Sequence, residues 1–174
     1  MLISDIPVMS AHHHPERIAI QYQDRAITFR ELRDRAHRLS QALMGIAAPG
    51  DRIAILAENC PEYIECYYAV PSAGMALTFL NYRLSARELT YILANAEPSV
   101  LVTEPGYLAT VDEIRPNVPS VKHVVVIGGN GGDMGYEDLL RRGSPEELPR
   151  NASGKILKRE LRDRLQSKPF PATT

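Results

Sequence analysis

Short apolar runs that alternate with amphipathic helices constrain the fold of this chain most strongly. Strands that are apolar on both faces are typical of parallel sheets covered by helices, since each strand is then buried on both sides. The alternation up to residue 140 predicts an α/β fold with a mostly parallel sheet and flanking helices. The runs expected to be strands are 52–57, 75–80, 99–103 and 121–128.

Two capping boxes and one proline mark where helices begin. Thr28 is followed three residues later by Glu31, and Ser85 by Glu88. In such a pair each side chain accepts from a backbone N–H that the first helical turn leaves unpaired. Pro61 suits the first turn of a third helix, where its missing N–H costs nothing. Shorter elements are also expected: a hairpin at 18–22 and 26–29, and helical segments at 107–115 and 135–140.

Composition excludes several classes of partner. The 174 residues are 44% hydrophobic and 24% charged, with a net charge of −1, as in ordinary globular proteins. Such a balance creates no field that would recruit nucleic acid, and no apolar run is long enough to cross a bilayer. The first residues have neither the basic start nor the apolar stretch of a secretory signal. We therefore expect a cytoplasmic protein with no nucleic-acid or integral-membrane partner.

Cysteines, histidines and glycines offer three candidate sites, and each has a simpler explanation. Cys60 and Cys66 lack the spacing of a zinc or redox motif and are expected to be reduced and buried. The adjacent histidines 12–14 cannot share one metal ion without folded support, so a frayed, solvated segment is expected there and no metal site. The glycine-rich run 128–135 lacks a dinucleotide fingerprint, because Met134 replaces the third glycine, which predicts a flexible loop.

The tail reads LPRNASGKILKRELR over residues 148–162. Its small residues are followed by Lys155 and then by an amphipathic helix expected from 153 to about 166, with leucines four residues apart. It is not a P-loop, because Pro149 stands where that motif needs glycine. Taken alone, Lys155 is more simply explained as an exposed lysine beside two other basic residues. A helix-start pattern at 144–147 is cut short by Pro149, which indicates either a surface loop or a junction.

This tail resembles the C-terminal signature of the AMP-forming acyl-CoA synthetases, the fatty-acid–CoA ligases of the acyl-adenylate-forming superfamily. Four further blocks resemble the N-terminal subdomain of the same family: 14–20, 27–43, 49–75 and 80–104. The resemblance implies two parts with the family's middle missing between them. Residues 1–147 would form a partial N-terminal subdomain, and residues 148–174 a C-terminal tail that carries the adenylation-lysine motif, joined near 147–149.

The resemblance also implies a reaction. Members activate a carboxylic acid, here most simply a fatty acid, with ATP and Mg²⁺ to give acyl-AMP, and then transfer the acyl group to the thiol of CoA. Lys155 matches the catalytic lysine, whose charge would stabilise the adenylation transition state. The family's phosphate loop, its aromatic–Thr–Glu motif and its ribose-binding Asp have no counterpart here. We therefore expect ATP, CoA and Mg²⁺ not to bind tightly, and the chain alone to be inactive, because coupled catalytic groups do not act singly.

Two other functions remain open at this point. The chain could be a non-catalytic binding or regulatory module that associates with a full-length ligase of the same family, or with itself. An unpaired sheet edge and exposed apolar faces would promote such association. A small independent nucleotide-binding α/β protein is the third possibility, and the failed glycine motifs count against it.

Overall fold

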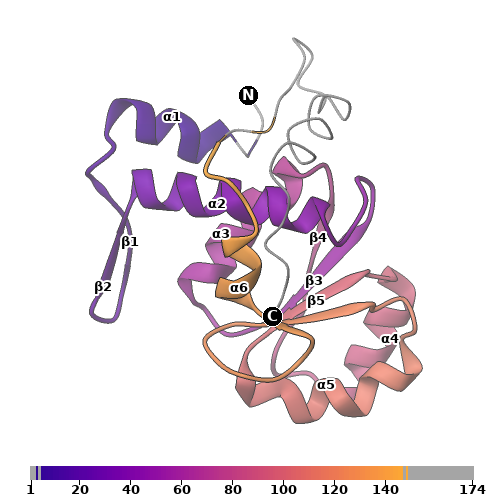
Figure 1. The fold of residues 1–174 in the computed structure, drawn as a ribbon. Coiled ribbons are helices and arrows are strands. Elements are labelled where there is room, and N and C mark those ends of the chain that lie inside the picture. The colour runs from indigo at the N-terminus through magenta and orange to yellow at the C-terminus, as the bar shows by residue number, and fades with distance from the viewer. Residues whose placement is uncertain (1–2, 4, 147, 149–174) are drawn as a thin grey trace.

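A five-stranded sheet, parallel throughout, forms the centre of the protein in the computed structural model, which describes residues 3, 5–146 and 148 (Figure 1). The strand order is β4-β3-β5-β6-β7, so the chain starts in the interior of the sheet and builds outward in both directions. This confirms the predicted α/β class. The strands are β3 (Arg52–Leu56), β4 (Ala76–Phe79), β5 (Val100–Thr103), β6 (His123–Val126) and β7 (Met134–Gly135).

Helices cover both faces of the sheet, which gives three layers. Alternate residues of each strand point to opposite faces, so that Ile53 and Ile55 join one apolar cluster while Ala54 and Leu56 join the other. The first cluster is closed by α2 (Phe29–Met44), α3 (Pro61–Ser72) and α6 (Tyr136–Arg141). The second is closed by α4 (Ala86–Ala96) and α5 (Leu108–Ile114), with the short helices η1 (Pro105–Tyr107) and η2 (Arg115–Asn117) at the two ends of α5.

Both predicted capping boxes are present. The backbone N–H of Glu31 donates to Thr28 Oγ1 over 3.2 Å, and the Thr28 N–H donates to the Glu31 carboxylate over 2.8 Å. At α4 the Ser85 N–H lies 2.9 Å from the Glu88 carboxylate, with the reciprocal bond at 3.4 Å. These bonds confirm the sequence prediction for where α2 and α4 begin.

The N-terminal region differs in part from expectation. The predicted hairpin is present as β1 (Ile18–Tyr22) and β2 (Arg25–Thr28), which pair antiparallel. Before it lies a helix that was not predicted, α1 (Asp5–His13), which packs beside α2 (Figure 1). The expectation of a frayed segment at the histidines was therefore wrong, although their side chains are exposed as expected. The helix escaped prediction because it buries only Pro7 and Ala11 and has no apolar stripe.

The glycine-rich run also holds more structure than a loop. Gly128, Gly131 and Gly132 have positive φ angles, which favour glycine. A Cβ on Gly132 would lie 2.9 Å from the carbonyl oxygen of Val124, so the turn also needs a residue without a side chain. The run then ends in β7, which pairs parallel with β6 and adds the fifth strand. The loop prediction was wrong for these last residues, because backbone pairing rather than side-chain pattern defines β7.

The segment after α6 lies along α2. Arg38 donates to the carbonyl oxygen of Gly143 over 3.0 Å, and the Gln41 side chain bonds the backbone of both Ser144 and Glu146. Residues 144–146 are not helical, so the surface-loop interpretation of that helix-start pattern holds for them. The expected junction near 147–149 lies outside the described residues except for Leu148, which is buried.

Candidate functional site

Lys155, the sequence-predicted catalytic residue, lies outside the described residues, as does the predicted tail helix. The fold itself points to another place, because ligands of open parallel sheets bind at the carboxyl ends of the strands where the chain changes direction. Here this point lies between β3 and β5, since β4 is added on one side of β3 and β5 on the other.

Two carboxylates and a phenol occupy this edge. Glu58 follows β3, and its backbone N–H donates to the Glu104 carboxylate over 2.8 Å. The Tyr107 hydroxyl donates to Glu58 Oε1 over 3.2 Å. Just inside the edge, the buried Thr103 hydroxyl donates to the Leu56 carbonyl over 3.0 Å. The loops after β3 and β5 are thereby fixed to each other by polar contacts.

These residues do not fit a nucleotide. A phosphate chain binds where free backbone N–H groups and positive charge converge, whereas here the Glu58 N–H is already bonded to a carboxylate. The acidic side chains of Glu58 and Glu104 would also repel a polyphosphate. Within residues 5–146 the structure has no group of three or more His, Cys, Asp or Glu side chains placed to hold a metal ion such as Mg²⁺.

A buried charge network lies among the helices of the first apolar cluster. Glu65 on α3 is fully buried, and its carboxylate accepts from Arg35 Nε of α2 over 2.6 Å and from the Tyr136 hydroxyl of α6 over 2.8 Å. Arg35 also bonds Glu137 at 2.6 Å. Burial raises the pKa of Glu65, while Arg35 opposes that rise. The network joins three helices on one face, and this is a structural role.

The two cysteines are buried and unbridged, as predicted. Burial raises the pKa of the Cys60 thiol to about 12 and raises that of Cys66 as well. The nucleophilic form of cysteine is the thiolate, which such pKa values suppress near neutral pH. Neither residue is therefore poised for nucleophilic or redox chemistry.

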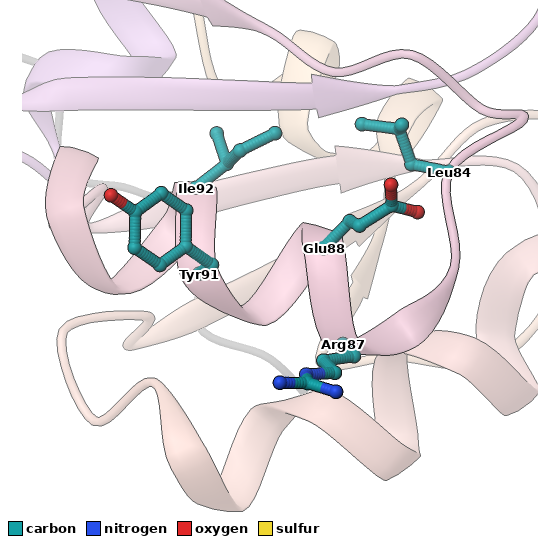
Figure 2. Close-up of a pocket in the computed structure, with 5 residues that line it drawn as sticks. All are labelled: Leu84, Arg87, Glu88, Tyr91 and Ile92. Atoms are coloured by element: carbon teal, nitrogen blue, oxygen red, sulfur yellow. The ribbon is translucent and has the colours of Figure 1, made fainter.

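A shallow hollow of about 460 Å³ runs along α4 (Figure 2). Leu84, Glu88 and Ile92 succeed one another at four-residue spacing, with Arg87 and Tyr91 beside them. Tyr91 is 74% exposed. The hollow is open and mainly apolar, and it contains no nucleophile–base pair.

In the described part of the chain, no helix is long and apolar enough to cross a membrane.

Sequence reasoning missed the polar groups that the fold brings together. Glu58 and Glu104 are 46 residues apart and meet only because β3 and β5 are neighbours. The burial of Glu65 could have been predicted from the sequence, because the apolar residues Cys66 and Ala69 lie on the same buried side of the helix. A carboxylate there predicts a buried ion pair, but its partners cannot be read from spacing alone.

Comparison with known proteins places the chain. A family model described as AMP-binding enzyme matches residues 9–159. A long-chain-fatty-acid–CoA ligase of Thermus thermophilus is 37% identical over 130 residues, which cover 72% of this chain and 24% of that protein. A medium-chain-fatty-acid–CoA ligase of Ectopseudomonas oleovorans is 31% identical over 157 residues, covering 82% of this chain and 29% of the ligase.

Solved structures agree with the sequence relatives. A putative long-chain-fatty-acid CoA ligase of Rhodopseudomonas palustris superposes with a TM-score of 0.77 at 30% identity, over 90% of this chain and 43% of that one. An anthranilate CoA ligase in complex with anthranoyl-AMP gives 0.78 at 25% identity, over 82% and 28%. The chain spans about a quarter of the length of the curated relatives it matches. It belongs to the AMP-binding enzyme family, that of the AMP-forming acyl-CoA synthetases.

Proposed function

We propose that this chain is a shortened acyl-CoA synthetase that does not catalyse the ligase reaction by itself. The family reaction is the ATP-dependent ligation of a fatty or other carboxylic acid to CoA through acyl-AMP, with Mg²⁺ accompanying ATP. Relatives named as long-chain and medium-chain fatty-acid ligases support a fatty acid as the ancestral substrate. A cytosolic location is part of the proposal, in keeping with two free thiols.

One observation carries the proposal of inactivity. The sheet edge where a doubly wound fold binds its ligand presents Glu58 and Glu104. The Glu58 N–H already donates to the Glu104 carboxylate and is not free to bind a phosphate. Electrostatic stabilisation of a reacting phosphate needs donors and positive charge aimed at it. In this proposal residues 1–147 form the partial N-terminal subdomain, and Lys155 in the 148–174 tail is a catalytic lysine without the groups that would position its substrate.

The test is acyl-CoA formation by the purified chain with ATP, Mg²⁺, CoA and fatty acids of several lengths. An intact acyl-CoA ligase serves as the positive control. We expect no product above the level given by the Lys155→Ala variant. Product that is lost in Lys155→Ala and kept in the matched variant Lys158→Ala would contradict the proposal.

A second candidate function is a non-catalytic partner of a full-length ligase. The observation that favours it is the end strand β4, whose outer side pairs with no strand among the described residues and whose Phe79 side chain is 49% exposed. Such an edge can pair with another chain. The test adds the chain to an intact ligase from the same organism and measures co-migration and the change in kcat. Separate migration with an unchanged kcat argues against this role.

A further inference from the structure

The glycine-rich run between β6 and β7 contains the only asparagine in the sequence that is followed by glycine, Asn130 before Gly131. Both residues are exposed. Within residues 5–146, neither the Asn130 side chain nor the Gly131 N–H has a hydrogen-bond partner, whereas the side chain of Asn81 accepts from the Arg83 N–H over 3.0 Å. The Asn130 carboxamide and the backbone nitrogen that follows it are therefore both available for reaction.

The backbone around Asn130 consists of glycines in conformations that other residues rarely adopt. Gly131 has a φ of +118°, and Gly128 and Gly132 have φ angles of +66° and +61°. A side chain on the residue after an asparagine shields the backbone nitrogen of that residue sterically. Gly131 has no such side chain, so its nitrogen is open to the carboxamide of Asn130.

Hydrogen bonds hold both ends of this loop. The Ile127 N–H donates to the Thr103 carbonyl over 2.8 Å, and the Asp133 N–H donates to the Val124 carbonyl over 2.9 Å. The Asp133 carboxylate also accepts from Arg115 and from the Val124 N–H, both over 2.7 Å. The residues between these two anchors can therefore rearrange without breaking the bonds that place β7.

We propose that Asn130 is a site of spontaneous deamidation, which proceeds through a cyclic imide shared with Gly131. The Gly131 nitrogen attacks the side-chain carbonyl carbon Cγ of Asn130 and forms a new C–N bond. The bond from Cγ to the side-chain nitrogen breaks, and that nitrogen leaves as ammonia with the proton of the Gly131 N–H. Water then opens the ring. Its attack at the side-chain carbonyl gives aspartate, and its attack at the backbone carbonyl gives isoaspartate.

The reaction adds a negative charge at the carboxyl edge of the sheet. The loop follows β6, which pairs with β5, and a Cβ on Gly129 would touch Pro105, the residue after Glu104. The new carboxylate would therefore join the edge that already presents Glu58 and Glu104, and it would increase the repulsion of a polyphosphate there. The deamidation itself does not depend on whether the chain is catalytically active.

The test incubates the folded full chain at neutral pH and follows its tryptic peptide 123–141 by mass spectrometry. Asn130 is the only asparagine in this peptide, which contains no glutamine, so the mass gain of deamidation can be assigned to one residue. We expect the gain to accumulate with time, and faster at higher pH, because the attacking Gly131 nitrogen must lose its proton. Labelling by an isoaspartate methyltransferase should increase in parallel.

A matched pair of variants checks the assignment. Asn130→Gln keeps a carboxamide but has to close a larger ring, so the modification should be lost. Asn117→Gln is the control, because Asn117 is also exposed but is followed by Val118, and the rate at Asn130 should be unchanged.

A synthetic peptide of residues 123–141 gives the rate of an unhindered site. The folded chain, monitored by circular dichroism, should react at Asn130 at a comparable rate. An Asn130 that stays intact in the folded chain while the synthetic peptide is deamidated would overturn the proposal. An equal mass gain in the peptide that contains Asn117 would overturn it as well, because the glycine-rich loop would then confer no selectivity.

Discussion

The Tyr136 hydroxyl donates a hydrogen bond over 2.8 Å to the buried carboxylate of Glu65, a residue 71 positions earlier in the chain. The same carboxylate accepts from Arg35 over 2.6 Å. The contact therefore fixes α6 onto α2 and α3 by polar bonds inside an otherwise apolar layer. A buried carboxylate without partners would destabilise the fold, so each hydrogen bond and ion pair to Glu65 should contribute to stability.

The two partners of Glu65 should differ in what their removal costs. Arg35→Leu leaves a buried carboxylate without its counter-charge and should lower the free energy of unfolding by about 3–5 kcal/mol. Tyr136→Phe removes one hydrogen bond to that carboxylate but leaves its counter-charge in place, and should cost about 1–3 kcal/mol. Urea unfolding measures both. Arg33→Leu is the control, because Arg33 pairs with Asp34 at the partly exposed surface and should cost about 1 kcal/mol or less. Equal losses for Arg35→Leu and Tyr136→Phe would contradict the role given to the ion pair.

The capping box of α2 should contribute a pH-dependent part of stability. Hydrogen bonds from Thr28 lower the pKa of Glu31 below its ordinary value of 4.5. A lowered folded-state pKa means that the contribution is complete above the unfolded value and is lost as the pH falls through the folded value. Glu31→Gln, which keeps a capping side chain but cannot ionise, should therefore flatten the fall in unfolding free energy below about pH 4.5. Thr28→Val should flatten it too; an unchanged slope in both variants would exclude the effect.

Gly143 marks a close approach of two backbone segments. A Cβ at this position would lie 2.0 Å from the carbonyl oxygen of Arg38, which cannot move without bending α2. Gly143→Ala should lower stability by about 1–3 kcal/mol, seen as a lower Tm by circular dichroism. Gly106→Ala is the matched control, because no atom lies within 4 Å of the place its new methyl group would take, and its effect should stay within about 0.5 kcal/mol. An unchanged Tm for Gly143→Ala would show that the segment after α6 does not pack against α2.

Local sequence signals predicted much of this fold because the forces behind them are local. Thr28 and Ser85 are each three residues from their capping partners, so both helix starts could be read directly. The parallel sheet followed from strands apolar on both faces. In contrast, α1 has no apolar stripe, and β7 is defined by pairing with β6. Neither property leaves a pattern in the residues themselves.

The candidate site was less predictable than the fold. The contact between Glu58 and Glu104 forms because β3 and β5 are adjacent in the sheet, and no residue spacing in the sequence predicts it. Lys155 could be given a role only through its resemblance to a family motif, since a lysine after a glycine is common on protein surfaces. A site formed by residues that lie far apart in the sequence can be predicted only once the order of the strands in the sheet is known.

Titration of ATP with Mg²⁺ into the purified chain by calorimetry tests the central claim, that this chain lacks a working nucleotide site. The wild type, Lys155→Ala and Lys158→Ala should all give only heats of dilution. Saturable binding by the wild type and by Lys158→Ala, weakened in Lys155→Ala, would contradict the claim and show a nucleotide site built around Lys155.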